Sequence, residues 1–297
     1  MNPLVSVVTP TYKRPEKLPR AINSVLNQTY PNVEIIIVDD NNPDTEARRK
    51  TEEIMASYAD NPRVKYIKHE HNKNGSAARN TGAKSSSAEY LAFLDDDDEF
   101  LPEKIAAQVQ RLEVLPEEYA VCYTTVIFEK EDGTRSESSE VREGDLFFDA
   151  LTRALSFQAG SNMLIRKTAF DEIGGFDETF KRSQDKEIVT RLLQYHKIAY
   201  APVKGLLAHV YADHSFVDPF KTTDYYVSKM QPFVDTLTPD MQKKYWAEIN
   251  RQLFYYSITR KRLGFALKLL FSSKVSVTDA VGIITKGFSR KYLNRKR

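Results

Sequence analysis

The sequence predicts an α/β protein in which helices cover both faces of a mainly parallel sheet, followed by a helical C-terminal extension. In the first hundred residues, short apolar and β-branched runs alternate with segments of helical spacing. The run at Val33–Val38 is apolar almost throughout, which is typical of a strand covered on both faces. After about Asp218 the pattern is helical to the end. Strands that alternate with helices indicate three layers, α/β/α.

The elements of the first hundred residues follow from periodicity and from the residues that flank each run. Apolar side chains recur three or four positions apart in Glu16–Gln28, as expected of a helix. Pro102 suits the first position of a helix, because proline lacks the N–H that has no partner there. The expected strands are Leu4–Thr9, Val33–Val38, Val64–Ile67 and Tyr90–Leu94, and the expected helices are Glu16–Gln28, Asp44–Tyr58, Ser76–Lys84 and Glu103–Leu115.

The second hundred residues predict a mixed region. Ala120–Glu129 and the stretch after Asp132-Gly133 are typical of a hairpin or of an excursion from the sheet. Further along, we expect strands at Gly160–Arg166 and Lys197–Tyr200, and helices at Lys167–Ile173 and Gln184–Tyr195. The chain is therefore expected to form one domain over residues 1–217 and a helical region with a basic tail over residues 218–297.

Composition excludes several classes of protein. The chain has 297 residues and one cysteine, Cys122, which excludes an internal disulfide framework and a zinc site built from several cysteines. A single cysteine also favours a reducing compartment, the cytoplasm. We expect no signal peptide and no membrane-spanning helix, because no basic region precedes a long apolar stretch and no apolar run approaches about 18 residues. No nucleic-acid partner is expected, and the oligomeric state is open.

The formal net charge of +2 conceals an asymmetry along the chain. From Arg260 to the end there are eleven Lys and Arg residues and one acid, Asp279, so this part carries +10 and the rest −8. Apolar and basic residues are interspersed in Lys268–Arg297, as in an amphipathic helix at a membrane interface. Such a tail would contact anionic lipid at the inner face of the cell membrane. The alternatives are a solvated terminus, or an apolar face packed on the first domain or on a second subunit.

Polar residues follow each of the four expected parallel strands. In an open parallel sheet, ligands bind beyond the carboxyl ends of the strands. Four successive strand ends that deliver polar side chains to one edge therefore indicate a binding site. The four segments are Pro10–Arg14, Asp39–Asn42, Asn74–Gly82 and Asp95–Asp98.

The acidic run Asp95–Asp98 is the most informative of these segments. Four carboxylates after the apolar strand YLAFL repel one another near a low-dielectric core. A divalent cation relieves that repulsion, and Mg²⁺ or Mn²⁺ takes carboxylate and phosphate oxygens as ligands. The alternative is a solvated acidic loop at the N-terminus of the following helix, where carboxylates are favoured.

The other segments offer groups for a nucleotide. Asp39 and Asp40 can accept hydrogen bonds from a base or ribose, although one of them is expected to make an Asx-turn instead. Tyr12 can stack on a base or simply pack on the protein. Arg14 and Arg79 suit a diphosphate, and each alone would be an ordinary surface charge. The segment GSAARNTG is not a Walker motif, so backbone binding of phosphate is not assured.

Taken in order, these segments resemble the family 2 glycosyltransferases with the GT-A fold, a Rossmann-like α/β/α domain. The resemblance covers about the first 210 residues. It implies a catalytic domain over residues 1–217 that transfers a sugar from a nucleotide-sugar, most often a UDP-sugar, with inversion at the anomeric carbon. The acceptor would be a saccharide or a lipid-linked sugar in cell-surface polysaccharide synthesis. The matching segments are Val5–Arg14, Glu34–Asp44, Asn74–Gly82, Tyr90–Asp98, Gly160–Arg166, Gly174–Glu178 and Gln184-Asp185.

The resemblance also implies roles for single residues in donor binding. Pro10, Tyr12 and Asp40 would border the nucleobase, with Arg14 and Arg79 as candidate partners of the diphosphate. Asp95 or Asp96 would lie near the ribose and the donor sugar.

Metal binding and catalysis follow from the same resemblance. Asp97 would bind Mn²⁺ or Mg²⁺, and a histidine after the last helix of the domain, His209 in preference to His214, would complete the metal shell. Asp185 would be the catalytic base, preceded by Gln184 where the family usually has Glu. The alternative for Asp185 is the N-terminal cap of the helix that it opens, and for each histidine an ordinary surface or core position.

Two other hypotheses account for part of the pattern. A nucleotidyltransferase also pairs a nucleotide with an acidic metal site, but such enzymes usually carry a Gly-rich loop with a lysine where this chain reads PTYKRP. A catalytically silent protein that binds a nucleotide or a carbohydrate would need the same loops and no catalytic base.

Overall fold

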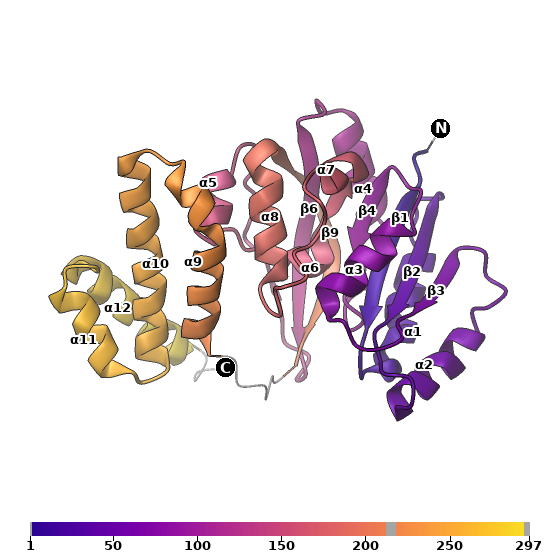
Figure 1. The fold of residues 1–297 in the computed structure, drawn as a ribbon, viewed down its shortest axis with the longest axis horizontal. Coiled ribbons are helices and arrows are strands. Elements are labelled where there is room, and N and C mark those ends of the chain that lie inside the picture. Colours follow the sequence, from indigo (N-terminus) through magenta and orange to yellow (C-terminus); the bar gives the residue numbers. More distant parts are fainter. Residues whose placement is uncertain (1, 212–217, 294–297) are drawn as a thin grey trace. The chain divides into compact units, whose positions relative to one another are not determined.

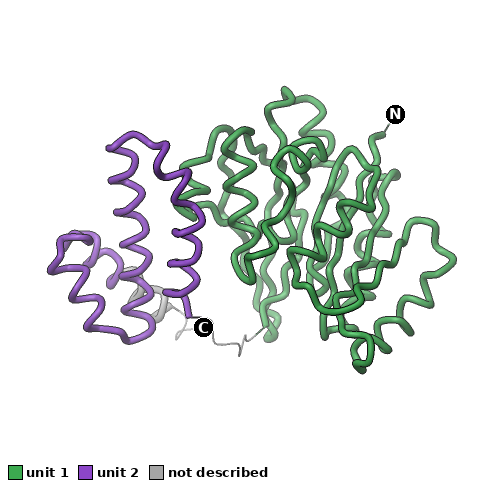
Figure 2. Tube along the Cα trace, in the orientation of Figure 1, with its two compact units in different colours: residues 1–214 green, residues 215–297 purple. Residues whose placement is uncertain are grey.

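The computed structural model describes residues 2–211 and 218–293, with the side chains described as far as residue 285. The chain divides into two compact units, Met1–His214 and Ser215–Arg297 (Figure 2). The first unit contains the sheet and the second is helical (Figure 1).

The described part of the first unit is built on a nine-stranded sheet in the order β3-β2-β1-β4-β8-β6-β9-β5, with β7 paired to β6. The strands are β1 (Val5–Thr11), β2 (Val33–Asp39), β3 (Val64–Lys68), β4 (Tyr90–Phe93), β5 (Glu99–Phe100), β6 (Tyr119–Lys130), β7 (Arg135–Glu137), β8 (Leu164–Arg166) and β9 (Lys197–Val210).

The first four strands form the parallel half of the sheet. Val5 of β1 lies opposite Val33 of β2 on one side and Tyr90 of β4 on the other, and β3 pairs with β2. All seven residues of β2 are buried, as predicted for a strand covered on both faces. The second half is mixed: β8 runs antiparallel to β4 and β6, β6 and β7 form the expected hairpin, and β6 and β9 are parallel.

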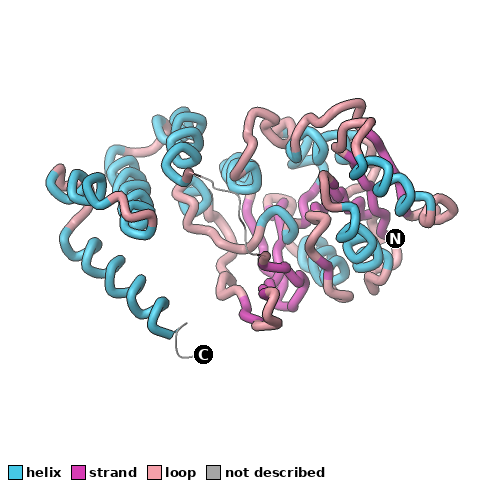
Figure 3. Tube along the Cα trace, turned by 90° about the horizontal axis from the view of Figure 1, so that it is seen from below, coloured by secondary structure: helices cyan, strands magenta, loops and turns pink. Residues whose placement is uncertain are grey.

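Successive residues of each central strand enter opposite cores, which gives the predicted three layers (Figure 3). Val7 packs with helices α1, α2 and α4 on one face, and Val8 packs with α3, α7 and α8 on the other. The helices of this unit are α1 (Leu18–Leu26), α2 (Glu46–Ala56), α3 (Gly75–Lys84), α4 (Lys104–Glu113), α5 (Phe147–Leu151), α6 (Ala159–Asn162), α7 (Lys167–Glu172) and α8 (Gln184–Tyr195), with a short 3-10 helix at Pro15–Lys17.

Two local predictions are wrong. Pro102 does not hold the first position of α4, because Glu103 is the N-cap and the helix begins at Lys104. The strand expected over Gly160–Arg166 is shorter: Ala159–Asn162 forms the helical turn α6, and β8 begins only at Leu164. The buried Asn162 side chain donates hydrogen bonds to the carbonyls of Thr124 and Phe157, at 2.7 and 2.9 Å, and these contacts hold the turn in place.

The second unit is the predicted helical extension. Its helices are α9 (Pro219–Asp235), α10 (Pro239–Thr259), α11 (Leu263–Phe271) and α12 (Val277–Leu293). Phe254, Ala266 and Leu269 lie in its buried cluster, together with the start of α12. A search of the described residues finds no helix that is both long and apolar enough to cross a membrane.

Candidate active site

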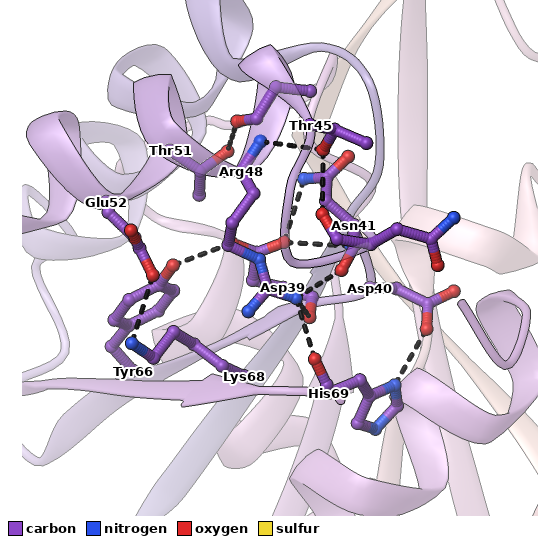
Figure 4. Close-up of polar contacts among 12 residues, drawn as sticks. Asp39, Asp40, Asn41, Thr45, Arg48, Thr51, Glu52, Tyr66, Lys68 and His69 are labelled. Atoms are coloured by element: carbon purple, nitrogen blue, oxygen red, sulfur yellow. Dashed lines mark hydrogen bonds and ion pairs between the residues drawn. The ribbon is translucent and has the colours of Figure 1, made fainter. Parts of the chain in front are cut away.

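Two buried aspartates lie where β2 ends: Asp39 is its last residue and shapes the chain where it leaves the strand, and Asp40 follows it (Figure 4). The Asp39 carboxylate accepts hydrogen bonds from the Asn41 backbone N–H at 2.9 Å and from the Tyr66 hydroxyl at 2.6 Å. It also pairs with Arg48 Nε at 3.1 Å. The bond to the residue two positions on is the Asx-turn expected of one member of this pair.

Asp40 organises the loop that leads into α3. Its carboxylate lies 2.7 Å from His69 Nδ1 and accepts hydrogen bonds from Asn72 Nδ2 at 2.7 Å, Lys73 N at 2.8 Å and Asn74 N at 3.0 Å. Figure 4 shows the contact with His69. Asp40 is 2% exposed, and its carboxylate holds the loop in place from inside the protein. We call the edge of the sheet where the four polar segments after β1, β2, β3 and β4 lie the rim.

Helix α3 carries the third rim segment against the sheet. Asn74 caps it by accepting hydrogen bonds from the backbone N–H groups of Ser76 and Ala77, at 2.9 and 3.2 Å. At Gly82 a Cβ atom would lie 2.3 Å from a methyl group of Val8, so only glycine allows the helix this close to β1. This close packing places the Arg79 guanidinium in an ion pair with Asp95.

The acidic run after β4 meets the first rim segment. Asp96 accepts a hydrogen bond from Thr11 Oγ1 at 2.8 Å and pairs with Arg14 Nη2 at 2.6 Å. The Arg14 guanidinium also pairs with Asp97, and Lys17 Nζ lies 3.8 Å from the same carboxylate. The end of β1 and the acidic run, which are more than eighty residues apart in sequence, therefore form one charged cluster.

Burial disfavours the charged forms of two of these carboxylates. It raises the pKa of Asp96 to about 7, although Arg14 and Thr11 act in the opposite direction. It raises the pKa of Asp98 to about 8, and the neighbouring charge of Asp95 adds to that shift. Negative charge is thus costly at this rim, and a cation that arrived there would be favoured.

The carboxylates at this rim are chemically suited to bind a hard divalent cation. Their side chains, however, are not arranged around a common point in this structure. Carboxylate oxygens are the ligands that Mg²⁺ and Mn²⁺ take, and Asp97 is only part-buried. Arg14 now supplies the positive charge between Asp96 and Asp97. Within the described ranges, no three His, Cys, Asp or Glu residues converge as a metal-binding group.

His209 lies beside this cluster and faces other carboxylates. Its Nε2 is 2.7 Å from Glu99 Oε1, and its Nδ1 is 3.4 Å from Glu129 Oε2. Its backbone N–H donates to Asp98 at 3.2 Å. The structure thus brings His209 to the acidic run through the backbone, with the ring directed to two glutamates. His214, the alternative, lies outside the described residues.

The remaining rim residues lie at the end of β1. Pro10 is half-buried in the strand, opposite Val38 of β2. Tyr12 is 38% exposed, and Lys13 Nζ lies 4.8 Å from the centre of its ring. Its ring is thus accessible to a planar ligand.

Asp185 lies in the first turn of α8 and is half-buried. The N-cap is Ser183, so the alternative interpretation of Asp185 as the helix cap is wrong. Its side chain lines a cavity of about 230 Å³ together with Arg153, Gln158, Ala159 and Lys186.

Helix α6 connects this cavity to the acidic run. Ala159 lines the cavity, and at the next residue, Gly160, a Cβ atom would lie 3.2 Å from Asp95 Oδ2. On the other side, a Cβ at Gly75 would be 3.0 Å from Arg79 Nη1 and 3.8 Å from Gln184 Nε2. Gly160 therefore lies beside Asp95, and Gly75 lies beside both Arg79 and the start of α8.

The loop that precedes α8 is docked on α3. Asn80 Oδ1 accepts a hydrogen bond from Phe176 N, and Asn80 Nδ2 donates to the Phe176 carbonyl, both at 2.9 Å. Asn74 Nδ2 donates to the carbonyl of Glu178 at 3.0 Å. These contacts explain how a residue about ninety positions from the acidic run comes to lie on the same rim.

Sequence reasoning missed Arg153 and Lys186, which share the cavity with Asp185. Arg153 lies in a loop with no motif around it. Lys186 had a weak signal, because it directly precedes the buried run Glu187–Thr190 in the helix that Asp185 opens.

Comparison with known proteins agrees with this fold. A solved structure of S. aureus TarS, residues 1–349 in complex with UDP-GlcNAc, superposes with a TM-score of 0.66 and covers 94% of this chain and 79% of its own, at 19% identity. An uncharacterized glycosyltransferase of Rickettsia felis is 32% identical over 202 residues, which are 67% of this chain and 33% of that protein. The GalNAc(5)-diNAcBac-PP-undecaprenol beta-1,3-glucosyltransferase of Campylobacter jejuni is 34% identical over 139 residues, 46% of this chain and 42% of that protein.

The fold of this chain is similar to that of the TarS structure. The model of glycosyl transferase family 2 matches residues 6–174, more than half of the chain. The chain therefore belongs to glycosyl transferase family 2, as the resemblance predicted. It has homologues in the synthesis of polysaccharides and lipid-linked sugars. This membership favours the first of the three hypotheses over the nucleotidyltransferase.

Proposed function

We propose that this protein is an inverting glycosyltransferase that moves a sugar from a UDP-sugar to a saccharide or lipid-linked acceptor. The observation that carries the proposal is the juxtaposition of Asp185 and its cavity with the Asp95–Arg79 pair across α6 and α3. A carboxylate next to an open cavity can receive an acceptor hydroxyl, while the donor lies along the rim. Catalysis is assigned to residues 1–217.

The chemistry needs one base and a means to stabilise the leaving diphosphate. In a single displacement, Asp185 accepts the proton of the acceptor hydroxyl as the oxygen attacks the anomeric carbon. Arg14 and Arg79 lie at the rim with guanidinium groups suited to phosphate oxygens. Asp97 and His209 would hold Mg²⁺ or Mn²⁺, which would stabilise the charge of the departing diphosphate.

Donor contacts follow from the same arrangement. Tyr12, Pro10 and the rim that Asp40 organises would border the nucleobase, with Asp95 and Asp96 near the ribose and the sugar. Two comparisons support the donor and acceptor classes: the TarS structure contains UDP-GlcNAc, and the name of the Campylobacter relative specifies an undecaprenol-linked acceptor. A role in cell-surface polysaccharide synthesis is proposed on the same basis.

The test is turnover of a panel of nucleotide sugars by the full chain, with Mn²⁺ and with EDTA. We expect release of UDP from at least one UDP-sugar, and a product with inverted anomeric configuration when an acceptor is supplied. Retention of configuration, or turnover of a nucleoside triphosphate with release of pyrophosphate, would contradict the proposal.

Replacement of Asp97 tests the metal. We expect Asp97→Ala to weaken Mn²⁺-dependent binding of UDP by about tenfold, because one charged ligand is lost and 1.4 kcal/mol corresponds to a factor of ten. Isothermal titration of UDP with Mn²⁺ and with EDTA measures the effect. The same UDP affinity in variant and wild type would remove Asp97 from the metal site.

We also propose that residues 218–297 contact anionic membrane peripherally and keep the protein at the inner face of the cell membrane. Among the large apolar side chains described in the second unit, those with the highest exposed fractions belong to α11 and the start of α12: Phe271 is 85% exposed, Val277 75% and Leu263 59%. Basic residues lie near them in the sequence, which suits a surface of anionic lipid. The side chains beyond residue 285, which carry much of the basic charge of Lys268–Arg297, lie outside the described residues.

Liposome co-sedimentation tests this surface. Truncation after Lys268 should abolish binding to vesicles that contain phosphatidylserine, but it also removes part of the buried cluster of this unit. The double variant Phe271→Ser, Val277→Ser leaves that cluster intact and should reduce binding several-fold, because less apolar surface enters the interface. Tyr195→Ser, at a residue 63% exposed in the first unit, is the matched control. Equal sedimentation of the double variant and wild type would favour packing against protein.

A further inference from the structure

The cavity beside Asp185 is lined by apolar and polar residues, and among its described charged residues two are basic and one is acidic. Arg153 and Lys186 line it together with Asp185, and the other described residues of its lining are neutral. Its volume of about 230 Å³ is below the roughly 300–1,000 Å³ of pockets that take drug-sized ligands. A cavity of this size suits one unit of a saccharide rather than a whole chain.

Lys186 carries its positive charge at a cost in this cavity. The pKa of Lys186 is lowered, first by burial and then by the nearby charge of Arg153, while Asp185 acts in the opposite direction. The described residues of the lining thus include one carboxylate and two basic groups. An anionic group that entered beside Arg153 and Lys186 would offset this cost, because charge-assisted hydrogen bonds replace a repulsion.

The backbone around the cavity is also unusual. Arg153, Gln158 and Ser183 have φ values of 60°, 54° and 61°, in the left-handed region that non-glycine residues rarely adopt. Two of them line the cavity, and the third caps the helix that presents Asp185 and Lys186. Strained residues of this kind cluster at ligand sites, where the surrounding structure holds them in place.

We propose that this cavity is an acceptor subsite for a sugar unit that carries an anionic group, a carboxylate or a phosphate, held by Arg153 and Lys186. The inference rests on the proposed role of Asp185, and it adds the chemical class of the acceptor. The anionic group fixes the unit so that its hydroxyl lies at Asp185. A neutral sugar can form no charge-assisted bond with Arg153 or Lys186, so the subsite favours an anionic unit over a neutral one.

Binding of three small probes to the full chain tests the subsite without any donor. The probes are methyl β-glucoside, which is neutral, methyl β-glucuronide, which carries a carboxylate, and glucose 1-phosphate, titrated by ligand-observed NMR. We expect at least one anionic probe to bind about tenfold or more tightly than the glucoside. The glucuronide alone would indicate an acidic sugar, and the phosphate alone a phosphorylated acceptor.

Variants then attribute the selectivity to the cavity. Lys186→Met and Arg153→Gln should each remove most of the preference, and Lys186→Arg should keep it, because the positive charge is retained. Lys84→Met, at an exposed lysine near the end of α3, should bind like wild type. Equal or undetectable binding of all three probes, or an unchanged preference in Lys186→Met, would overturn the inference. Since no donor is present, such a failure is distinct from a failure of sugar transfer itself.

Discussion

Asp185→Asn should lower the rate of sugar transfer by about 10²–10⁴-fold, the range that a positioned general base supplies. Asparagine keeps the size of the side chain and its place in the first turn of α8, but it cannot accept the proton of the attacking hydroxyl. The affinity for UDP should change little, because Asp185 lines the cavity on the far side of α6 from the acidic run. Initial rates of UDP release in the presence of acceptor, with titration of UDP binding in parallel, measure both quantities.

The control for this variant is Asp60→Asn, at an exposed aspartate in the loop after α2. It makes the same chemical change in the first unit and should transfer sugar at the wild-type rate. Full transfer by Asp185→Asn would remove Asp185 from the mechanism. A loss of transfer accompanied by loss of UDP binding would indicate a role in donor binding instead of proton transfer.

The parallel half of the sheet could be predicted from the sequence because burial there leaves a simple pattern. A strand covered by helices on both faces needs apolar side chains at successive positions, and Ile35, Ile36 and Ile37 are all fully buried. The polar residues that follow each such strand are then conspicuous. The acidic run and the segment after β1 do meet in the structure, through Arg14 and Thr11.

The mixed half could not be predicted as well, because long-range polar contacts decide its local structure. Asn162 receives hydrogen bonds from Thr124, 38 residues away, and from Lys104, 58 residues away. These contacts produce the turn α6 where the apolar pattern predicted a strand. Periodicity reports burial along one segment and carries no information on such partners.

The same limit applies to the candidate site. Asp40 and His209 could be selected from the sequence as polar residues near strand ends. The groups that bind their side chains could not be predicted from it. The carboxylate of Asp40 holds the loop before α3, and the ring of His209 faces Glu99 and Glu129. These partners come from segments that only the fold brings together.

The buried lysine Lys104 is expected to make the free energy of unfolding depend strongly on pH. Lys104 is fully buried, and its ammonium donates to Gln108 Oε1 at 2.8 Å and to the Asn162 carbonyl at 3.0 Å. It also lies 4.7 Å from the centre of the Phe100 ring. These partners are neutral, so they compensate desolvation only in part, and burial lowers the pKa of Lys104 to about 7.

The sign of the effect follows from proton binding in the two states. Below pH 7 the folded and unfolded chains both hold the proton, and the full cost of burying the charge is present. Between about pH 7 and pH 10.5, the ordinary pKa of a lysine in an unfolded chain, the unfolded chain binds more protons, so the free energy of unfolding rises with pH. The slope approaches about 1.4 kcal/mol per pH unit, which amounts to about 2 kcal/mol between pH 7 and 9.

Lys104→Met isolates this contribution. Urea unfolding of the wild type and the variant at pH 7, 8 and 9 should show a difference in unfolding free energy that grows in favour of the wild type by about 2 kcal/mol across the window. Titration of Asp98 affects both proteins and cancels in that difference. The window ends at pH 9 because burial raises the pKa of Cys122 to about 12, and the unfolded thiol begins to ionise near 9. Lys84→Met should parallel the wild type at every pH, since that lysine is exposed. If the free energies of unfolding of Lys104→Met and wild type changed with pH in parallel, the buried ammonium would keep its proton between pH 7 and 9. Its hydrogen bonds to Asn162 and Gln108 would then stabilise the charge more strongly than we expect of neutral partners.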